Sequence, residues 1–169
     1  SEATKITANY LLALARQESG CRSDARAKGT TAVGMFQFVE VTWIRAMHDH
    51  GADYGEAELV QAIVAERGRL SITPASKRDV ILDRRLDAQL SAYLAAEFAR
   101  ENADYLQRKL GKPLTATDLY MAHFLGAGGA SDFLAALDNR PQMPANLLLP
   151  AAAAEIGRAS CRERVCSVV

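Results

Sequence analysis

The chain has 169 residues, 24% of them charged, with 20 basic and 20 acidic side chains and a formal net charge of zero. This length suits one domain with a hydrophobic core, and the composition is globular rather than disordered. Balanced charge gives no electrostatic reason to expect DNA, RNA or anionic lipid as a partner. No apolar run reaches the roughly 18 residues that a bilayer requires, so the sequence predicts no membrane span.

The two ends of the chain differ from the rest. Residues 1–20 lack the charged start, apolar block and cleavage site of a signal peptide, and the missing initiator Met suggests a fragment. Residues 155–169 are basic, carry two of the three cysteines and resemble translated sequencing-adapter DNA. We expect a non-native or disordered tail there and one domain over residues 1–154. Cys21 is the cysteine that remains, so no disulfide framework is predicted.

Apolar residues at helical spacing predict helices along most of the chain. A first helix over residues 3–19 is expected to stop at Gly20, since glycine adopts the left-handed conformation of helix C-caps. An irregular loop rich in Ser, Asp, Gly and Thr follows over residues 21–33. A second helix is predicted over residues 39–50, with Trp43 facing inward.

The helical pattern continues to the end of the domain. We predict a third helical segment over residues 56–68, one long helix or two joined near Asn102 over residues 86–110, and a cap at Thr115 or Thr117. The remaining predictions are a loose capping pattern over residues 76–79, a helix over 118–125, a turn in "GAGGAS", a helix over 131–137, and an extended exit marked by Pro141, Pro144 and Pro150. No window alternates at period two, so we predict an all-α domain of about seven helices.

Glu18 is notable because it falls in the last turn of the first predicted helix. The partial negative charge of a helix C-terminus raises the pKa of a carboxyl group, and burial against Phe36, Phe38 or Trp43 acts in the same direction. A carboxyl group that is protonated near neutral pH can act as a general acid. Taken alone, a glutamate at a helix end is more often a solvated surface residue.

Two neighbouring motifs carry a resemblance: the pair Glu18-Ser19, and the run Gly-Met-Phe-Gln at residues 34–37 followed by Thr42-Trp43. They make the sequence resemble the soluble lytic transglycosylase family, whose fold is a lysozyme-like helical domain related to goose-type lysozymes. The pair Glu18-Ser19 is similar to the family's Glu-Ser at a helix end. The run Gly-Met-Phe-Gln at residues 34–37, followed by Thr42-Trp43, is similar to its Gly-Leu-Met-Gln motif. The resemblance covers about residues 3–140.

The family's third motif is present in a divergent form, "MAHFLGAGGA" at residues 121–130. His123 stands where the family commonly has Tyr, and Phe124 where it has Asn. The partner of Glu18 is therefore open: His123 or Tyr120 could donate a hydrogen bond to the carboxylate or to a sugar. A histidine packed between helices is the equally weighted alternative for His123.

The resemblance implies a lytic transglycosylase that acts on bacterial peptidoglycan. Glu18 would protonate the oxygen between N-acetylmuramic acid and N-acetylglucosamine and then deprotonate the muramic acid 6-hydroxyl, which closes a 1,6-anhydro ring. One carboxylate suffices, whereas most glycosidases use two. The implied substrate-binding residues are Ser19, Met35, Phe36, Gln37, Phe38, Tyr120 and His123. One phenylalanine is expected in the core, and Ser19 is expected to orient Glu18 or to touch an N-acetyl group.

The resemblance also implies a periplasmic or cell-envelope location, peptidoglycan glycan strands as the partner, a monomer, and no cofactor or metal. One alternative is a muramidase that hydrolyses the same bond, with Asp24 or Glu40 as a second acidic group. Another is a non-catalytic peptidoglycan-binding or assembly module, which the altered third motif would suit. A helical partner-binding domain without a sugar site is the third.

Other charged clusters carry weaker signals. His48 and His50 are two residues apart, which places them on nearly opposite helix faces and suits a metal poorly. The mixed charges of "ERGRL" at residues 66–70 and "DRRLD" at 83–87 are typical of solvated faces.

Overall fold

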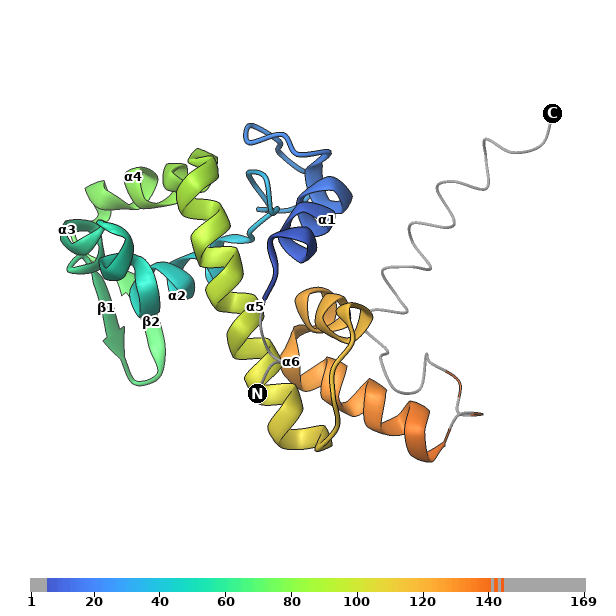
Figure 1. Cartoon of the computed structure of the whole chain (residues 1–169). Coiled ribbons are helices and arrows are strands. Elements are labelled where there is room, and N and C mark those ends of the chain that lie inside the picture. Colours follow the sequence, from blue (N-terminus) through green and yellow to red (C-terminus); the bar gives the residue numbers. More distant parts are fainter. Residues whose placement is uncertain (1–5, 141, 143, 145–169) are drawn as a thin grey trace. The chain divides into compact units, whose positions relative to one another are not determined.

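Helices dominate the part of the chain that the structure describes, which is residues 6–140, 142 and 144 of a computed structural model (Figure 1). In chain order the elements are α1 (Ala8–Ser19), α2 (Glu40–His50), the 3₁₀ turn η2 (Gly51–Tyr54), α3 (Ala57–Val60), β1 (Ile63–Glu66), β2 (Arg69–Ile72), η3 (Ala75–Lys77), α4 (Arg78–Asp83), η4 (Arg84–Leu86), α5 (Ala88–Leu110) and α6 (Ala116–Asn139). The predicted all-α class is confirmed, with six α-helices in these residues rather than about seven. The predicted tail over residues 155–169, and Pro141 and Pro150 of the predicted exit, lie outside the described residues.

The helix α1 has a defined cap at each end. The hydroxyl of Thr7 accepts a hydrogen bond from the first turn, and the helix ends at Ser19. Gly20 follows with φ of 63°, the left-handed conformation, which confirms the predicted stop. Cys21 also has φ of 63°, a conformation that costs a non-glycine residue about 1–2 kcal/mol. Two left-handed residues in succession turn the chain sharply away from the helix. The predicted start at residue 3 is wrong, because the N-cap Thr7 is extended and α1 begins at Ala8.

In the unit formed by residues 5–101, the core gathers around Trp43. Its side chain is 0% exposed, and its indole Nε1 donates a 2.7 Å hydrogen bond to the carbonyl of Ile81, which joins α2 to α4. The ring of Phe38 packs edge-on against Trp43 and Phe98, with ring centroids 5.3 and 6.4 Å away. The predicted inward orientation of Trp43 is confirmed, and α2 begins within one residue of its predicted start.

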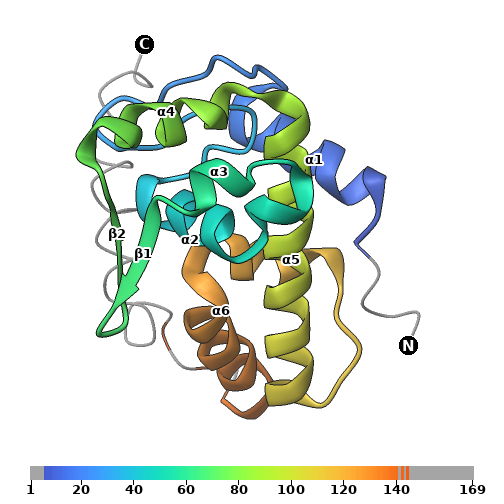
Figure 2. The same ribbon diagram turned by 90° about the vertical axis from the view of Figure 1, so that its left-hand side faces the viewer.

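The third helix predicted over residues 56–68 is wrong. Helix is confined to α3, and the chain from Ile63 forms β1, which pairs antiparallel with β2. Arg67 and Gly68 connect the strands with φ of 49° and 78°, as a two-residue hairpin turn of matching twist requires. Figure 2 shows this hairpin leaving α3 and returning toward α4. A small sheet is therefore inserted in a helical domain.

The capping pattern predicted over residues 76–79 is also wrong. Ser76 lies within η3, and α4 begins at Arg78 without a side-chain hydrogen bond at its N-cap. The long helix predicted over residues 86–110 is α5, which continues through Asn102 without a break. Of the two predicted options, the single helix is confirmed.

The second unit contains the end of α5 and all of α6. Thr115 caps α6 with a reciprocal pair of bonds: its hydroxyl accepts from the N–H of Asp118 at 3.2 Å, and the Asp118 carboxylate accepts from the N–H of Thr115 at 2.7 Å. The helix is interrupted at Gly126, where φ is 73° and ψ is 157°. The predicted turn in "GAGGAS" is thus reduced to a kink at its first residue. One hydrophobic core cluster of this unit contains the buried side chains of Leu106, Ala122, Ala130 and Leu134, with Phe133 and Met121 packed against them.

We expect Thr115→Ala to lower the free energy of unfolding by about 1 kcal/mol, because the substitution removes the acceptor of the N-cap. Thr117→Ala is the matched control, since Thr117 is exposed inside the first turn and alanine is the better helix former. Urea unfolding followed by circular dichroism measures both. Equal effects of the two substitutions would contradict the capping role.

Candidate active site

Glu18 lies in the last turn of α1 and is half-buried. Burial raises the pKa of its carboxyl group above the ordinary value of 4.5, because the charged form loses hydration. The helix C-terminus acts in the same direction, since its partial negative charge repels a carboxylate. This environment suits a group that must carry a proton before it reacts.

Ser19 joins the end of α1 to a segment that is distant in sequence. Its hydroxyl lies 2.8 Å from the carbonyl oxygen of Met35 and 3.2 Å from that of Ala15, and it accepts a 3.1 Å bond from the N–H of Arg22. All three partners are main-chain groups. Of its two predicted roles, the orientation of the adjacent Glu18 is the one that these bonds suit.

Residues 31–38, here called the motif loop, contain the Gly-Met-Phe-Gln run as a tight turn. The N–H of Gln37 bonds to the carbonyl of Gly34 at 3.2 Å, and Gly34 and Gln37 have positive φ values of 86° and 48°. Short bridges pair Val33 with Phe38 and with Arg26. Backbone hydrogen bonds therefore stabilise the turn independently of its side chains.

Glycine is required at position 34 for two separate reasons. Its φ of 86° is one that other residues rarely adopt, and an added Cβ would lie 2.1 Å from the carbonyl oxygen of Arg85. Arg85 lies in η4, so the motif loop packs directly on a distant part of the backbone. The glycine of the motif is thus explained by chain packing.

The side chain of Gln37 stabilises the same turn. Its amide nitrogen donates to the carbonyl oxygens of Gly34 at 2.8 Å and Ala25 at 3.3 Å. These bonds use both amide hydrogens. The amide oxygen of Gln37 is the group that suits the predicted substrate contact, and that contact stays a prediction.

Phe36 and Phe38 are both core residues, with 2% and 3% of their surfaces exposed. The prediction that one of the two offers a ring face to a sugar is therefore wrong. Residues two apart in an extended segment point to the same side, so both rings can enter the core. Met35 is half-buried and stays a predicted substrate contact.

The segment that carries Glu18 and the motif loop has a match among known families. Residues 1–61 match the family model described as the transglycosylase SLT domain. This segment is similar to the SLT domain. The matched segment includes α1, the motif loop and α2, and the family indicates transglycosylase-type action on the glycosidic bonds of peptidoglycan. The lysozyme-like resemblance predicted from the motifs is confirmed.

Arg85, which lies outside the matched segment, is a buried residue that the motifs did not reveal. The sequence "DRRLD" suggested a solvated face, but the Arg85 side chain is 6% exposed. Its neighbour Arg84 is half-exposed and pairs with Glu56 and Asp87, as a solvated face predicts. The mixed-charge pattern is therefore right for one arginine and wrong for the next, and local sequence offered no signal that separates them.

The third motif lies on α6, outside the unit that contains Glu18. Tyr120 and His123 are both half-buried and three residues apart on the helix, whereas Phe124 is largely exposed. Burial lowers the pKa of His123 below 6.5, so its imidazole is neutral at pH 7. That Tyr120 or His123 assists Glu18 stays a prediction.

The other candidate acids and metal ligands differ in exposure and in the side chains that they contact. Glu40 forms an ion pair with Arg78, and Asp24 is exposed in the loop after α1. His48 contacts Asp49 at 2.5 Å and His50 contacts Glu101 at 2.7 Å.

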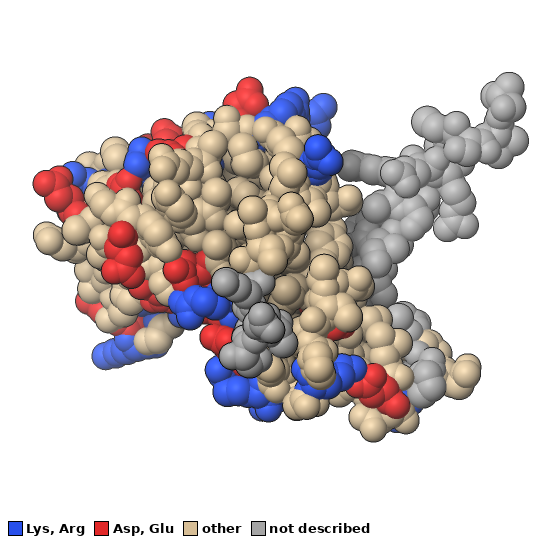
Figure 3. All heavy atoms as spheres, in the orientation of Figure 1, with Lys and Arg blue, Asp and Glu red and all other residues tan. Residues whose placement is uncertain are grey.

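Among the residues that the structure describes, no group of three His, Cys, Asp or Glu side chains could hold a metal ion, and no helix is long and apolar enough to cross a membrane. On the face drawn in Figure 3, basic and acidic side chains are interspersed.

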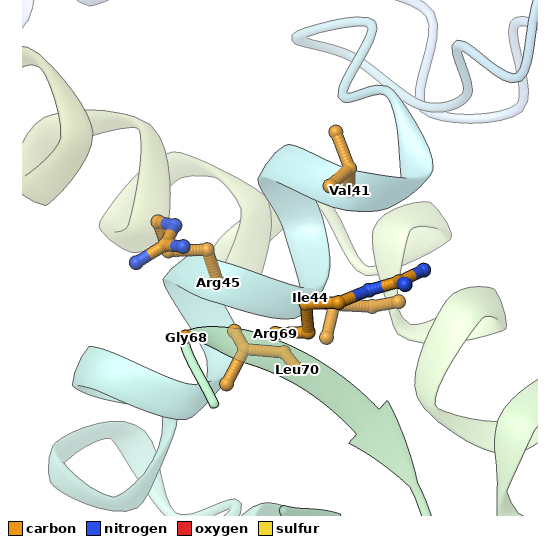
Figure 4. Close-up of a pocket in the computed structure, with 6 residues that line it drawn as sticks. All are labelled: Val41, Ile44, Arg45, Gly68, Arg69 and Leu70. Carbon is orange, nitrogen blue, oxygen red and sulfur yellow. The ribbon is translucent and has the colours of Figure 1, made fainter. Parts of the chain in front are cut away.

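A pocket of about 250 Å³ lies between α2 and the hairpin (Figure 4). Its lining residues are Val41, Ile44, Arg45, Gly68, Arg69 and Leu70. Neither Glu18 nor the Gly34–Phe38 segment contributes to it. The guanidinium groups of Arg45 and Arg69 point away from each other in Figure 4, so they do not converge on one anion. This pocket is distinct from the candidate active site.

We expect Gly34→Ala to lower the free energy of unfolding by about 3 kcal/mol or more, because it combines a clash with backbone strain. Gly29→Ala is the matched control: its φ is 81°, but an added Cβ would meet nothing within 4 Å. The control should cost only about 1–2 kcal/mol for the left-handed conformation. Chemical unfolding of both variants separates the clash from the strain, and equal losses would show that the Arg85 contact is not tight.

Proposed function

We propose that this protein is a peptidoglycan lytic transglycosylase in which Glu18 is the single catalytic acid and base. The observation that carries the proposal is the setting of Glu18: a half-buried carboxyl group with a raised pKa, at a helix end that Ser19 joins to the SLT motif loop. The substrate would be the β-1,4 bond between N-acetylmuramic acid and N-acetylglucosamine. The cell envelope, where peptidoglycan lies, is the matching location, and a monomer is expected.

The reaction needs one proton donor that later accepts a proton. The Glu18 carboxyl first donates its proton to the bridging oxygen as the bond from that oxygen to the muramic anomeric carbon breaks. The substrate's N-acetyl group assists at this carbon. The resulting carboxylate then takes the proton of the muramic 6-hydroxyl, whose oxygen bonds to the anomeric carbon and closes the 1,6-anhydro ring. The proton returns to Glu18, and no water is consumed.

The match to the transglycosylase SLT domain supports this one-carboxylate route over a hydrolytic one. A hydrolase that used a second acid would need a free carboxylate near the scissile bond. Glu40 is paired with Arg78, and Asp24 is exposed. Met35, Tyr120 and His123 are the proposed substrate contacts whose side chains are only partly buried.

The pH dependence of lysis should report the Glu18 carboxyl group. Activity requires the protonated form, so the rate falls as pH rises through its pKa. Because burial raises that pKa above 4.5, the falling limb should lie above pH 4.5, on the neutral side of an ordinary glutamate. The measurement is the initial rate of peptidoglycan lysis from pH 4 to 9 at constant ionic strength. A falling limb of the pH–rate profile at or below pH 4.5 would contradict a buried Glu18 acid.

Product analysis of purified peptidoglycan tests the reaction itself. The unchanged protein should release muropeptides that are lighter by one water than hydrolytic products, as mass spectrometry measures. Glu18→Gln should lower the rate by at least about a thousandfold, since it removes the only proton donor while preserving shape. Asp24→Asn is the matched control and should leave the rate within about twofold, because exposed substitutions have small effects.

Each rival function gives a different result in the same experiment. Hydrated products that depend on Glu18 would identify a muramidase, and loss of activity in Asp24→Asn would supply its second acid. Binding of peptidoglycan without any lysis would identify a non-catalytic module. The absence of both binding and lysis would leave a helical partner-binding domain.

A further inference from the structure

The buried side chain of Arg85 contacts both ends of the motif loop. Its Nη1 donates to the carbonyl oxygen of Thr31 at 2.7 Å and to that of Phe38 at 3.2 Å. Its Nε donates to the carbonyl of Leu82 at 2.8 Å, which anchors the guanidinium to α4. One rigid planar group thus links the first and last residues of the loop to a helix far along the chain.

Hydrogen bonds to carbonyl oxygens are what make this buried cation tolerable. Burial lowers the pKa of Arg85, and the charge of Arg26 acts in the same direction while Asp83 opposes it. A buried guanidinium is costly unless its donors are satisfied, and charge-assisted bonds are about twice as strong as neutral ones. Because a core can be built from apolar side chains at lower cost, a retained buried cation is consistent with bonds that organise the chain around it.

The backbone of Arg85 contacts the same loop. Its carbonyl oxygen faces Gly34, where no side chain would fit, and accepts a 2.8 Å bond from the buried hydroxyl of Ser91 in α5. The loop therefore meets Arg85 at three points: Thr31, Gly34 and Phe38. Between these points lies Met35, whose carbonyl contacts the Ser19 hydroxyl beside Glu18.

We infer that Arg85 is a positioning residue of the active site, whose guanidinium holds the motif loop against α4 so that the Met35 carbonyl stays in place for Ser19. Arg85 acts through the loop and Ser19, and it does not touch the reacting atoms. The catalytic part of this inference rests on the proposed function, whereas the ordering of the loop does not.

Three variants test the inference. Arg85→Met keeps the length of the side chain and removes its donors. Arg85→Lys keeps the charge but loses the Nε donor and the planar group that aims Nη1. Arg100→Met is the matched control, because Arg100 is exposed and pairs with Glu97 on α5. Melting temperatures are measured first, and all further assays are made well below the lowest of them.

The first assay does not depend on activity. Amide hydrogen exchange should become at least about tenfold faster at Val33 and Gly34 in Arg85→Met, relative to the amides of α5, because their bonds to Phe38 and Ala25 open with the loop. Arg85→Lys should show a smaller increase, and Arg100→Met none. Unchanged exchange at these two amides overturns the inference. If Arg85→Met does not fold, the Arg85→Lys result decides.

The second assay measures lysis of peptidoglycan. Arg85→Met should lose activity by about a hundredfold, the cost of a displacement near 1 Å, and Arg85→Lys by about tenfold. The falling limb of the pH profile should move to lower pH in Arg85→Met, since a loop that leaves Ser19 opens the end of α1 to water. Ser19→Ala combined with Arg85→Met should lose less than the product of the two single losses, because both act through one contact. If Arg85→Met only lowered the stability of the fold, the falling limb of the pH profile would stay at the pH of the unchanged protein.

The two assays separate this inference from the proposed function. Faster loop exchange in Arg85→Met, in a protein that does not lyse peptidoglycan, supports the loop-ordering role and rejects the proposed enzyme. Lysis by the unchanged protein with an unshifted pH limb and independent effects of Ser19→Ala and Arg85→Met rejects the positioning role and retains the enzyme.

Discussion

The 2.8 Å contact between the Ser19 hydroxyl and the Met35 carbonyl is the interaction on which the candidate site depends. It joins the end of α1 to a loop 16 residues away, and it acts on the residue next to Glu18. This contact fixes the position of the helix end that carries Glu18. The setting of Glu18 is therefore a property of how two segments pack.

Several motif residues stabilise the backbone conformation or the core. Gly34 leaves room for a carbonyl, Gln37 uses its amide hydrogens on the turn, and Phe36 and Phe38 fill the core. A motif of this kind describes a backbone conformation as much as a binding surface. The surface that would meet the sugars must accordingly be built from fewer of the predicted side chains than the motif suggests.

Two groups with an unfavourable loss of hydration, the Glu18 carboxyl group and the Arg85 guanidinium, are linked to the motif loop. A half-buried carboxyl group resists ionisation, and a buried guanidinium gives up its hydration. Functional sites commonly retain such groups at a cost in stability that the rest of the fold offsets. Here the offset comes from main-chain hydrogen bonds and from the Trp43 core beneath the loop.

The sequence by itself determined what depends on neighbours along the chain. Gly20 ends α1, Thr115 caps α6, and Glu18 falls in a last helical turn, because caps and turns involve residues within about four positions. The all-α class followed from helical spacing repeated over long segments. The pair Glu18-Ser19 with the Gly-Met-Phe-Gln run was enough to indicate the family.

Only the tertiary structure decided which side chains are covered and which short apolar runs pair as strands. The run that begins at Ile63 fits a helix or a strand, and its pairing with Ile72 made it a strand. Arg85 lies 54 residues from Thr31 and 47 from Phe38, so nothing in "DRRLD" reveals those carbonyls as its partners. Burial is set by segments that are distant in sequence, and periodicity within one segment cannot report them.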